Sequence, residues 1–180
     1  MYDYGDLFKL DHKETVKQFL EKCSSEVTPI TDTCMTLLAA CMSTSPMGTV
    51  EHFISDPFTD MQVGVTKSDT NKRICVVFRG TDSKSDWYYD LMIAKTDIGN
   101  GVCVHTGVHT QLHTNDVFEK ISEIVNQLVG NYPDYSIYIT GHSLGGALAT
   151  LFGFEFGMST SKDICVVSFA SPRVGNFKFK

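Results

Sequence analysis

The sequence has a deficit of basic residues, no long apolar run and a single tryptophan. Its 15 lysine and arginine residues, against 21 aspartate and glutamate residues, leave a formal net charge of −6. Because nucleic-acid backbones are bound through clustered basic side chains, this balance argues against nucleic acid as a partner. No apolar run approaches the ~20 residues that a membrane-spanning helix needs. We therefore expect a globular protein without a transmembrane segment.

Signals for secretion are also missing from the sequence. The first residues, MYDYGDLFKLDHKE, carry acidic side chains where a signal peptide has a basic segment and an apolar core. The chain contains no N-x-S/T acceptor for N-glycosylation. Both absences favour a cytoplasmic location.

Six cysteines lie at positions 23, 34, 41, 75, 103 and 165, and none of them has C-x-x-C spacing. Cys75 and Cys165 fall inside apolar runs, where a small hydrophobic residue fits, so we interpret the cysteines as buried thiols. A disulfide framework is the alternative, but it is typical of secreted domains much smaller than this one.

Three histidines have a spacing that could join them on one helical face. His105, His109 and His113 stand at i, i+4 and i+8. Gly107 interrupts this segment, and no carboxylate or cysteine joins it. A partly exposed helical face explains the spacing as well, so we predict no metal site, and nothing in the sequence indicates a cofactor.

The order of apolar patterns indicates the fold class. At 180 residues and 42% hydrophobic content, residues 1–180 suit one domain with a sizeable core, and residues 1–50 form an N-terminal helical segment. Further on, strand patterns alternate with helix patterns, which predicts an α/β fold with a parallel sheet and functional loops at the carboxyl ends of the strands. We expect helices at 11–24, 31–42, 108–129 and 144–158, and strands at 61–65, 74–78, 91–95, 102–105, 135–139 and 164–169.

One serine stands at the joint between the strand at 135–139 and the small-residue helix that follows. Residues 141–145 read GHSLG, the G-x-S-x-G pattern of a nucleophile elbow, in which a tight turn presents the serine at the top of the sheet. A side chain at Gly141 or Gly145 would collide across so tight a turn. The pentapeptide alone also suits a glycine-rich turn with a solvated serine, but the flanking strand and helix favour the elbow. Ser143 is therefore the candidate nucleophile.

A polar loop after the strand at 74–78 turns aromatic at Trp87, Tyr88 and Tyr89. These side chains could form a mobile flap over a pocket or a hydrophobic plug at the end of the core. From the residues alone we favour the plug.

Four stretches in order resemble one family. They are VVFRGT with a following D-W-x-x-D-L, VHTG before a long helix, TGHSLGGALA, and SFASPRVGN, and together they span roughly residues 61–176. They resemble the class 3, or fungal-type, lipases among the α/β-hydrolases. The resemblance implies a mostly parallel sheet with helices on both faces. It also implies a serine ester hydrolase that cleaves acyl esters of an acylglycerol-like lipid through an acyl-enzyme on Ser143.

The resemblance also assigns the residues around the nucleophile. The backbone N–H of Leu144 and Thr81 would form the oxyanion hole. Residues 82–91 would form a lid in which Trp87 faces the acyl chain, which favours the flap over the plug and a substrate at a membrane or micelle surface. His142 neighbours the nucleophile, but a residue one step away in an elbow points elsewhere, so we interpret it as structural.

The sequence departs from the family in its acid and base. In α/β-hydrolases these follow the nucleophile in the order Ser, Asp or Glu, His, whereas all six histidines here precede Ser143. After Ser143, Glu155 lies within the elbow helix, and Asp163 precedes its strand at the wrong end of the sheet. We expect the family's acid and base beyond Lys180, so that the chain is truncated after the strand that follows the nucleophile helix. The alternatives are a non-catalytic interaction module and an esterase or thioesterase without lipid preference.

Overall fold

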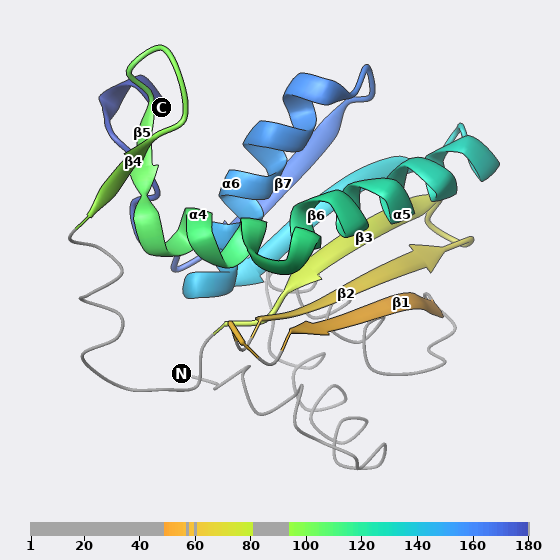
Figure 1. The fold of residues 1–180 in the computed structure, drawn as a ribbon. Coiled ribbons are helices and arrows are strands. Elements are labelled where there is room, and N and C mark those ends of the chain that lie inside the picture. Colours follow the sequence, from red (N-terminus) through yellow and green to blue (C-terminus); the bar gives the residue numbers. More distant parts are fainter. Residues whose placement is uncertain (1–48, 57, 60, 81–93, 180) are drawn as a thin grey trace.

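The computed structural model describes residues 49–56, 58–59, 61–80 and 94–179, and its elements are arranged as Figure 1 shows. Five strands form one sheet in the order β1-β2-β3-β6-β7, and β4 and β5 form a separate two-stranded ribbon. The strands are β1 Thr49–Asp56, β2 Met61–Ser68, β3 Arg73–Phe78, β4 Lys95–Asp97, β5 Cys103–His105, β6 Ser136–His142 and β7 Ile164–Phe169. The helices are α4 Thr106–His113, α5 Val117–Asn131 and α6 Leu144–Ser159, with short 3-10 turns η2 Thr114–Asp116 and η3 Phe177–Phe179. The helices predicted at 11–24 and 31–42 lie outside the described residues.

The large sheet is antiparallel in one half and parallel in the other. The β1–β2 and β2–β3 pairs are antiparallel, whereas β3–β6 and β6–β7 are parallel. A tight turn joins β2 to β3, and strands joined in that way run in opposite directions. Helical segments separate β3 from β6 and β6 from β7, which allows parallel pairing. The predicted parallel sheet is therefore confirmed for β3, β6 and β7. Strand β1 was not predicted, because its side chains are mostly exposed and do not alternate.

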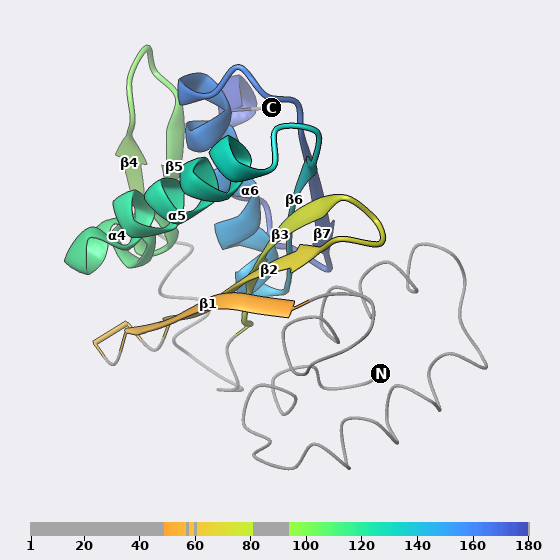
Figure 2. The same cartoon turned by 90° about the vertical axis from the view of Figure 1, so that its right-hand side faces the viewer.

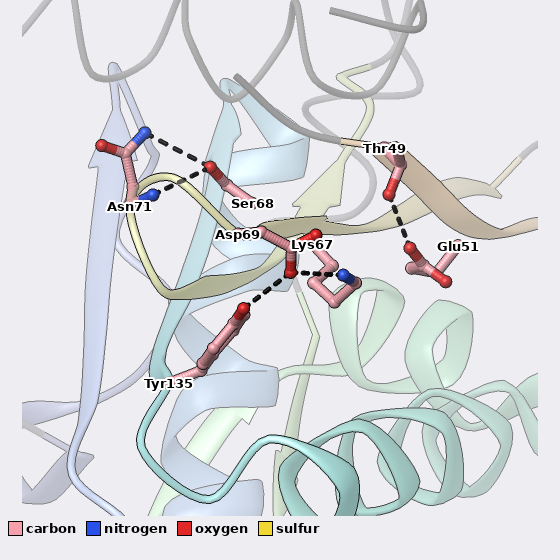
Figure 3. A network of polar contacts seen from close by, with 7 residues as sticks. All are labelled: Thr49, Glu51, Lys67, Ser68, Asp69, Asn71 and Tyr135. Atoms are coloured by element: carbon pink, nitrogen blue, oxygen red, sulfur yellow. Dashed lines mark hydrogen bonds and ion pairs between the residues drawn. The ribbon is translucent and has the colours of Figure 1, made fainter. Parts of the chain in front are cut away.

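The β2–β3 turn is tied to the start of β6 by a polar network (Figure 3). The Tyr135 hydroxyl donates to the Asp69 carboxylate at 2.6 Å, and Lys67 Nζ lies 2.5 Å from the same oxygen. Within the turn, the backbone N–H and the side-chain amide of Asn71 both donate to Ser68 Oγ at 3.3 Å. This network holds the end of the sheet that is opposite to the predicted elbow.

The core lies between the sheet and the helices. Figures 1 and 2 show α4, α5 and α6 on one side of the sheet. The inward faces of β2, β3 and β6 contribute fully buried side chains such as Val63, Val76 and Ile139, and α6 adds Phe152 and Phe156, whose rings stack at 5.4 Å. The prediction of helices on both faces of the sheet is confirmed for the face that α4, α5 and α6 cover. None of the described helices lies on the opposite face.

The predicted helix at 108–129 is two helices. It begins two residues earlier, so that Gly107 lies within α4 and does not interrupt it. Between α4 and α5 the chain breaks at Asn115 and Asp116, which have φ values of 56° and 57°. Short polar side chains tolerate this left-handed conformation better than most residues. The Asn115 amide also donates to the Asp56 carboxylate of β1 at 2.9 Å, which fixes the break against the sheet.

The predicted second hairpin is confirmed in shorter form. Strands β4 and β5 pair in antiparallel register around a turn in which Gly99, Asn100 and Gly101 all have positive φ. Glycine and asparagine suit such a turn because they adopt this conformation at little cost. Residues 91–93 of the predicted strand lie outside the described residues.

The interpretation of the cysteines as buried thiols is right for one of the three described and wrong for the others. Cys75 is 2% exposed, Cys103 is half-buried and Cys165 is exposed, and all three are free thiols. Cys165 lies on β7, the last strand of the sheet among the described residues, and none of the described helices covers the face of β7 that carries it. Among the described helices, none combines the length and the apolar character that crossing a bilayer requires.

Candidate active site

Ser143 occupies a strained turn between β6 and α6. Its φ of 54° and ψ of −122° lie outside the regions that a residue with a side chain normally adopts. Hydrogen bonds hold this conformation from both sides: Ser143 N–H donates to Phe169 O at 2.9 Å, and Ala147 N–H donates to Ser143 O at 3.1 Å. The side chain makes no capping bond to α6, and the residue is half-buried, so reagents can reach it. Strain imposed by the surrounding structure at a reachable serine is typical of a nucleophile elbow.

The two glycines of the motif have different steric partners. A Cβ on Gly141 would lie 2.2 Å from the carbonyl oxygen of Gly145, across the turn, as the sequence predicts. A Cβ on Gly145 would instead lie 2.3 Å from Phe78 O and 2.8 Å from Arg79 O, which belong to the end of the neighbouring strand and the loop after it. Gly145 therefore allows the elbow to lie directly against the loop that follows β3.

That loop reaches the elbow at a third glycine. Phe78 pairs with Gly141, and a Cβ on Gly80 would lie 2.7 Å from the carbonyl oxygen of His142. Gly80 therefore has backbone contact with the residue before the nucleophile. Thr81, the predicted second oxyanion donor, is the next residue but lies outside the described residues, as does Trp87 of the predicted lid. The requirement for glycine at position 80 was not predicted, because it arises from contact between β3 and β6.

Leu144 begins α6 and is 3% exposed. The N–H groups of the first helical residues have no acceptor within their own helix, and the helix dipole places positive potential at this end. A backbone N–H at this position is suited to bind a negative oxygen next to Ser143, and the oxyanion role of Leu144 stays a prediction.

The remaining histidines and acidic residue considered from the sequence are His142, His105 and Asp163. His142 ends β6 and is half-buried, and its carbonyl faces Gly80. His105 ends β5, is 6% exposed, and donates its backbone N–H to Val174 O. Asp163 precedes β7 at the end of the sheet opposite to the elbow, as predicted.

Glu155 has a place that was not predicted. It lies in α6 with its carboxylate oxygen 2.9 Å from Nε2 of His113, and the two groups form a cluster with His109. The expectation that no carboxylate joins these histidines is therefore wrong. No sequence pattern predicts this contact, because it depends on the packing of α4 against α6.

An open cavity of about 560 Å³ lies beside the elbow helix. Its walls include Thr150 of α6, Ser168 of β7 and the loop from Ser171 to Phe177, and Ser143 is not among its lining residues.

The site thus has a strained serine between a parallel strand and a helix, with a glycine-containing loop packed against it. A family model described as Lipase (class 3) matches residues 75–180. The chain belongs to the class 3 lipase family. A lipase from Rhizopus niveus is 32% identical over 147 residues, covering 77% of this chain and 36% of that protein. A secreted mono- and diacylglycerol lipase A from Penicillium cyclopium is 31% identical over 133 residues, covering 71% and 42%.

Solved structures of class 3 lipase relatives show the same fold. The lipase from Rhizopus microsporus var. chinensis superposes with a TM-score of 0.70 and 30% identity, covering 93% of this chain and 61% of that one. A triacylglycerol lipase whose catalytic centre is a serine protease triad superposes with a TM-score of 0.67 and 29% identity, covering 74% and 52%. The predicted α/β-hydrolase fold is confirmed. The chain spans about a third to two fifths of the length of the curated relatives it matches.

Proposed function

We propose that this class 3 lipase-family protein is a serine ester hydrolase that cleaves acyl esters of a lipid through an acyl-enzyme on Ser143. The observation that carries the proposal is the backbone of Ser143, with φ 54° and ψ −122°, at the junction of β6 and α6. A fold that only needed a turn here would relieve this strain with glycine or asparagine. The presence of a serine in this strained, half-buried position supports the assignment of Ser143 as a nucleophile.

The chemistry proceeds in two steps. The Ser143 hydroxyl attacks the ester carbonyl while a base takes its proton, and the oxyanion binds the N–H of Leu144 and the donor at Thr81. The carbon–oxygen bond to the alcohol then breaks, and the alcohol leaves with the proton returned by the base. Water attacks the acyl-enzyme in the same way, releasing the acid and restoring the serine.

The base of this reaction is not one of the six histidines of the sequence. All of them precede Ser143, whereas an α/β-hydrolase base follows the nucleophile and the acid. We therefore propose that the acid and the base follow β7 in the full-length protein. His105, the most buried of the described histidines, has its backbone fixed to Val174 and is assigned no role in catalysis.

The substrate class is proposed from the relatives. Their names specify lipase, mono- and diacylglycerol lipase and triacylglycerol lipase activity. We propose an acylglycerol-like substrate taken from a membrane or micelle surface, with Trp87 in a lid over the acyl chain. Since Trp87 is the single tryptophan, its emission should shift to the blue when vesicles or micelles are added. An emission maximum indifferent to lipid would favour the plug.

Covalent labelling tests the nucleophile. The full-length protein should react with a fluorophosphonate at Ser143, located by mass spectrometry of the peptides, and Ser143→Ala should remove the adduct. Ser136→Ala is the matched control, because this exposed serine stands on the same strand at its other end. Labelling at another serine in folded protein, or equal labelling of Ser143→Ala, would show that Ser143 is not the nucleophile.

The second candidate is a non-catalytic interaction module, favoured by the position of all six histidines before Ser143. It predicts a folded full-length protein that neither labels nor hydrolyses short-chain and long-chain nitrophenyl esters. An enzyme does both, and hydrolysis of the short ester alone would indicate an esterase without lipid preference.

A further inference from the structure

A cluster of three titratable side chains lies between α4 and α6, outside the candidate active site. His109 and His113 are one turn apart on α4, with ring centroids 4.4 Å from each other. Glu155 approaches from α6, and its Oε2 is 2.9 Å from His113 Nε2. One ligand atom from each of the three residues lies within 4.8 Å of the others, and among the described residues this is the group of histidine, cysteine and carboxylate side chains with that property.

The cluster is half-buried. The side chains of His113 and Glu155 are 29% and 14% exposed, and the ring of Phe118 packs on His113 with centroids 5.3 Å apart. His113 Nε2 faces the Glu155 carboxylate at 2.9 Å and has no other hydrogen-bond partner among the described residues.

Burial and neighbouring charges shift the pKa values of two groups in the cluster. Burial raises the pKa of Glu155, because the carboxylate loses water, while the neighbouring His113 acts in the opposite direction. The charge of Glu119, an exposed residue of α5, raises the pKa of Glu155 further. Burial, with a smaller contribution from His113, lowers the pKa of His109.

We propose that His109, His113 and Glu155 bind a divalent transition-metal ion, with Zn²⁺ as the best fit. Two imidazoles and one carboxylate are a donor set that zinc accepts, with water in the fourth position. Histidines at i and i+4 project from the same face of a helix, so one ion can reach both. Tetrahedral zinc with bonds of about 2.0–2.1 Å places its ligand atoms roughly 3.4 Å apart. The ligand atoms here lie within 4.8 Å of one another, so binding of one ion requires them to approach by up to about 1.4 Å.

The site would act on the fold and not on ester cleavage. Glu155 lies about three turns, or roughly 18 Å, along α6 from Ser143, beyond the reach of a metal-bound water. An ion held by α4 and α6 would instead fix the helix that begins at the nucleophile against the helix before it. The proposal therefore stands whether or not the protein is a hydrolase.

Metal titration of the purified full chain tests the site. Isothermal titration with ZnCl₂ should give one ion per chain, and Co²⁺ should give the visible absorption of a four-coordinate nitrogen and oxygen site. Glu155→Gln and His109→Asn should each weaken binding at least about tenfold, since each removes one of three protein ligands. Zn²⁺ should also raise the Tm of the wild type and leave the Tm of Glu155→Gln unchanged.

Matched controls separate the cluster from other ligands. His52→Asn and Glu123→Gln remove exposed groups on β1 and α5 and should leave Zn²⁺ affinity as in the wild type. Prior alkylation of the thiols should also leave it unchanged, because cysteines are the chief competing ligands. Glu155→Gln preserves shape, so it reports on binding even if a histidine variant fails to fold. Absence of Zn²⁺ binding, binding lost on alkylation, or binding equal in Glu155→Gln and the wild type would each overturn the proposal.

Discussion

Gly145 offers a sharp test of how closely the elbow lies against β3. In Gly145→Ala the new Cβ would start 2.3 Å from Phe78 O, and this gap has to open to at least 3.0 Å. The obstacle is a backbone carbonyl, which cannot rotate away as a flexible side chain can. Overpacking of this kind costs about 1–3 kcal/mol. The better helix propensity of alanine returns at most about 1 kcal/mol, so the variant should be less stable by about 1–2 kcal/mol.

Thermal unfolding and labelling measure the two consequences of this change. For a chain of this size, a loss of about 1–2 kcal/mol lowers Tm by about 2–8 °C. Because the displaced carbonyls belong to the segment that leads to Thr81, fluorophosphonate labelling of Ser143 should slow by about 10–100-fold. Gly130→Ala is the control, since Gly130 is a helical glycine with nothing within 4 Å of its Cβ position, and it should raise Tm. If Gly145→Ala were as stable and as reactive as the wild type, the close packing of the elbow against the end of β3 would be refuted.

Three further changes have defined outcomes. Iodoacetamide should modify exposed Cys165 in the folded protein and should modify Cys75 only after unfolding, because burial raises the pKa of the Cys75 thiol to about 12. Mass spectrometry of the peptides measures both modifications. Hydrogen bonds, chiefly from Thr59, lower the pKa of Asp56, while burial opposes them. The Asp56 carboxylate therefore stabilises the fold above about pH 4, and this contribution is lost as the pH falls through the lowered pKa. Asp56→Asn should therefore be less stable than the wild type at pH 7, by about 1 kcal/mol or more in urea titrations, with a smaller difference at pH 3. Phe156→Ala should cost about 3–5 kcal/mol, seen as a lower urea midpoint at unchanged m, because the ring is fully buried against Phe152.

Much of the fold was encoded locally. Runs of apolar residues predicted β2, β3, β6 and β7, since a strand buried on the core face needs apolar side chains whatever its partners are. The strand–turn–helix pattern around Ser143 predicted the elbow, because glycines and a small-residue helix leave few other conformations. The break at Asn115 and the exposed strand β1 were missed. Both depend on contacts with distant residues, such as the bond from Asn115 to Asp56.

The environment of each predicted site was decided by packing. Leu144 could be assigned from its place at the start of a helix, since orphan N–H groups are a local property. The need for glycine at Gly80 arises only where the loop after β3 meets β6, and a sequence pattern carries no information on that distance. In the same way, His109 and His113 could be paired from their spacing alone, but Glu155, 42 residues after His113, joins them only because α6 packs against α4. Spacing fixes neighbours on one element, whereas a site shared by two elements depends on the side chains buried between them.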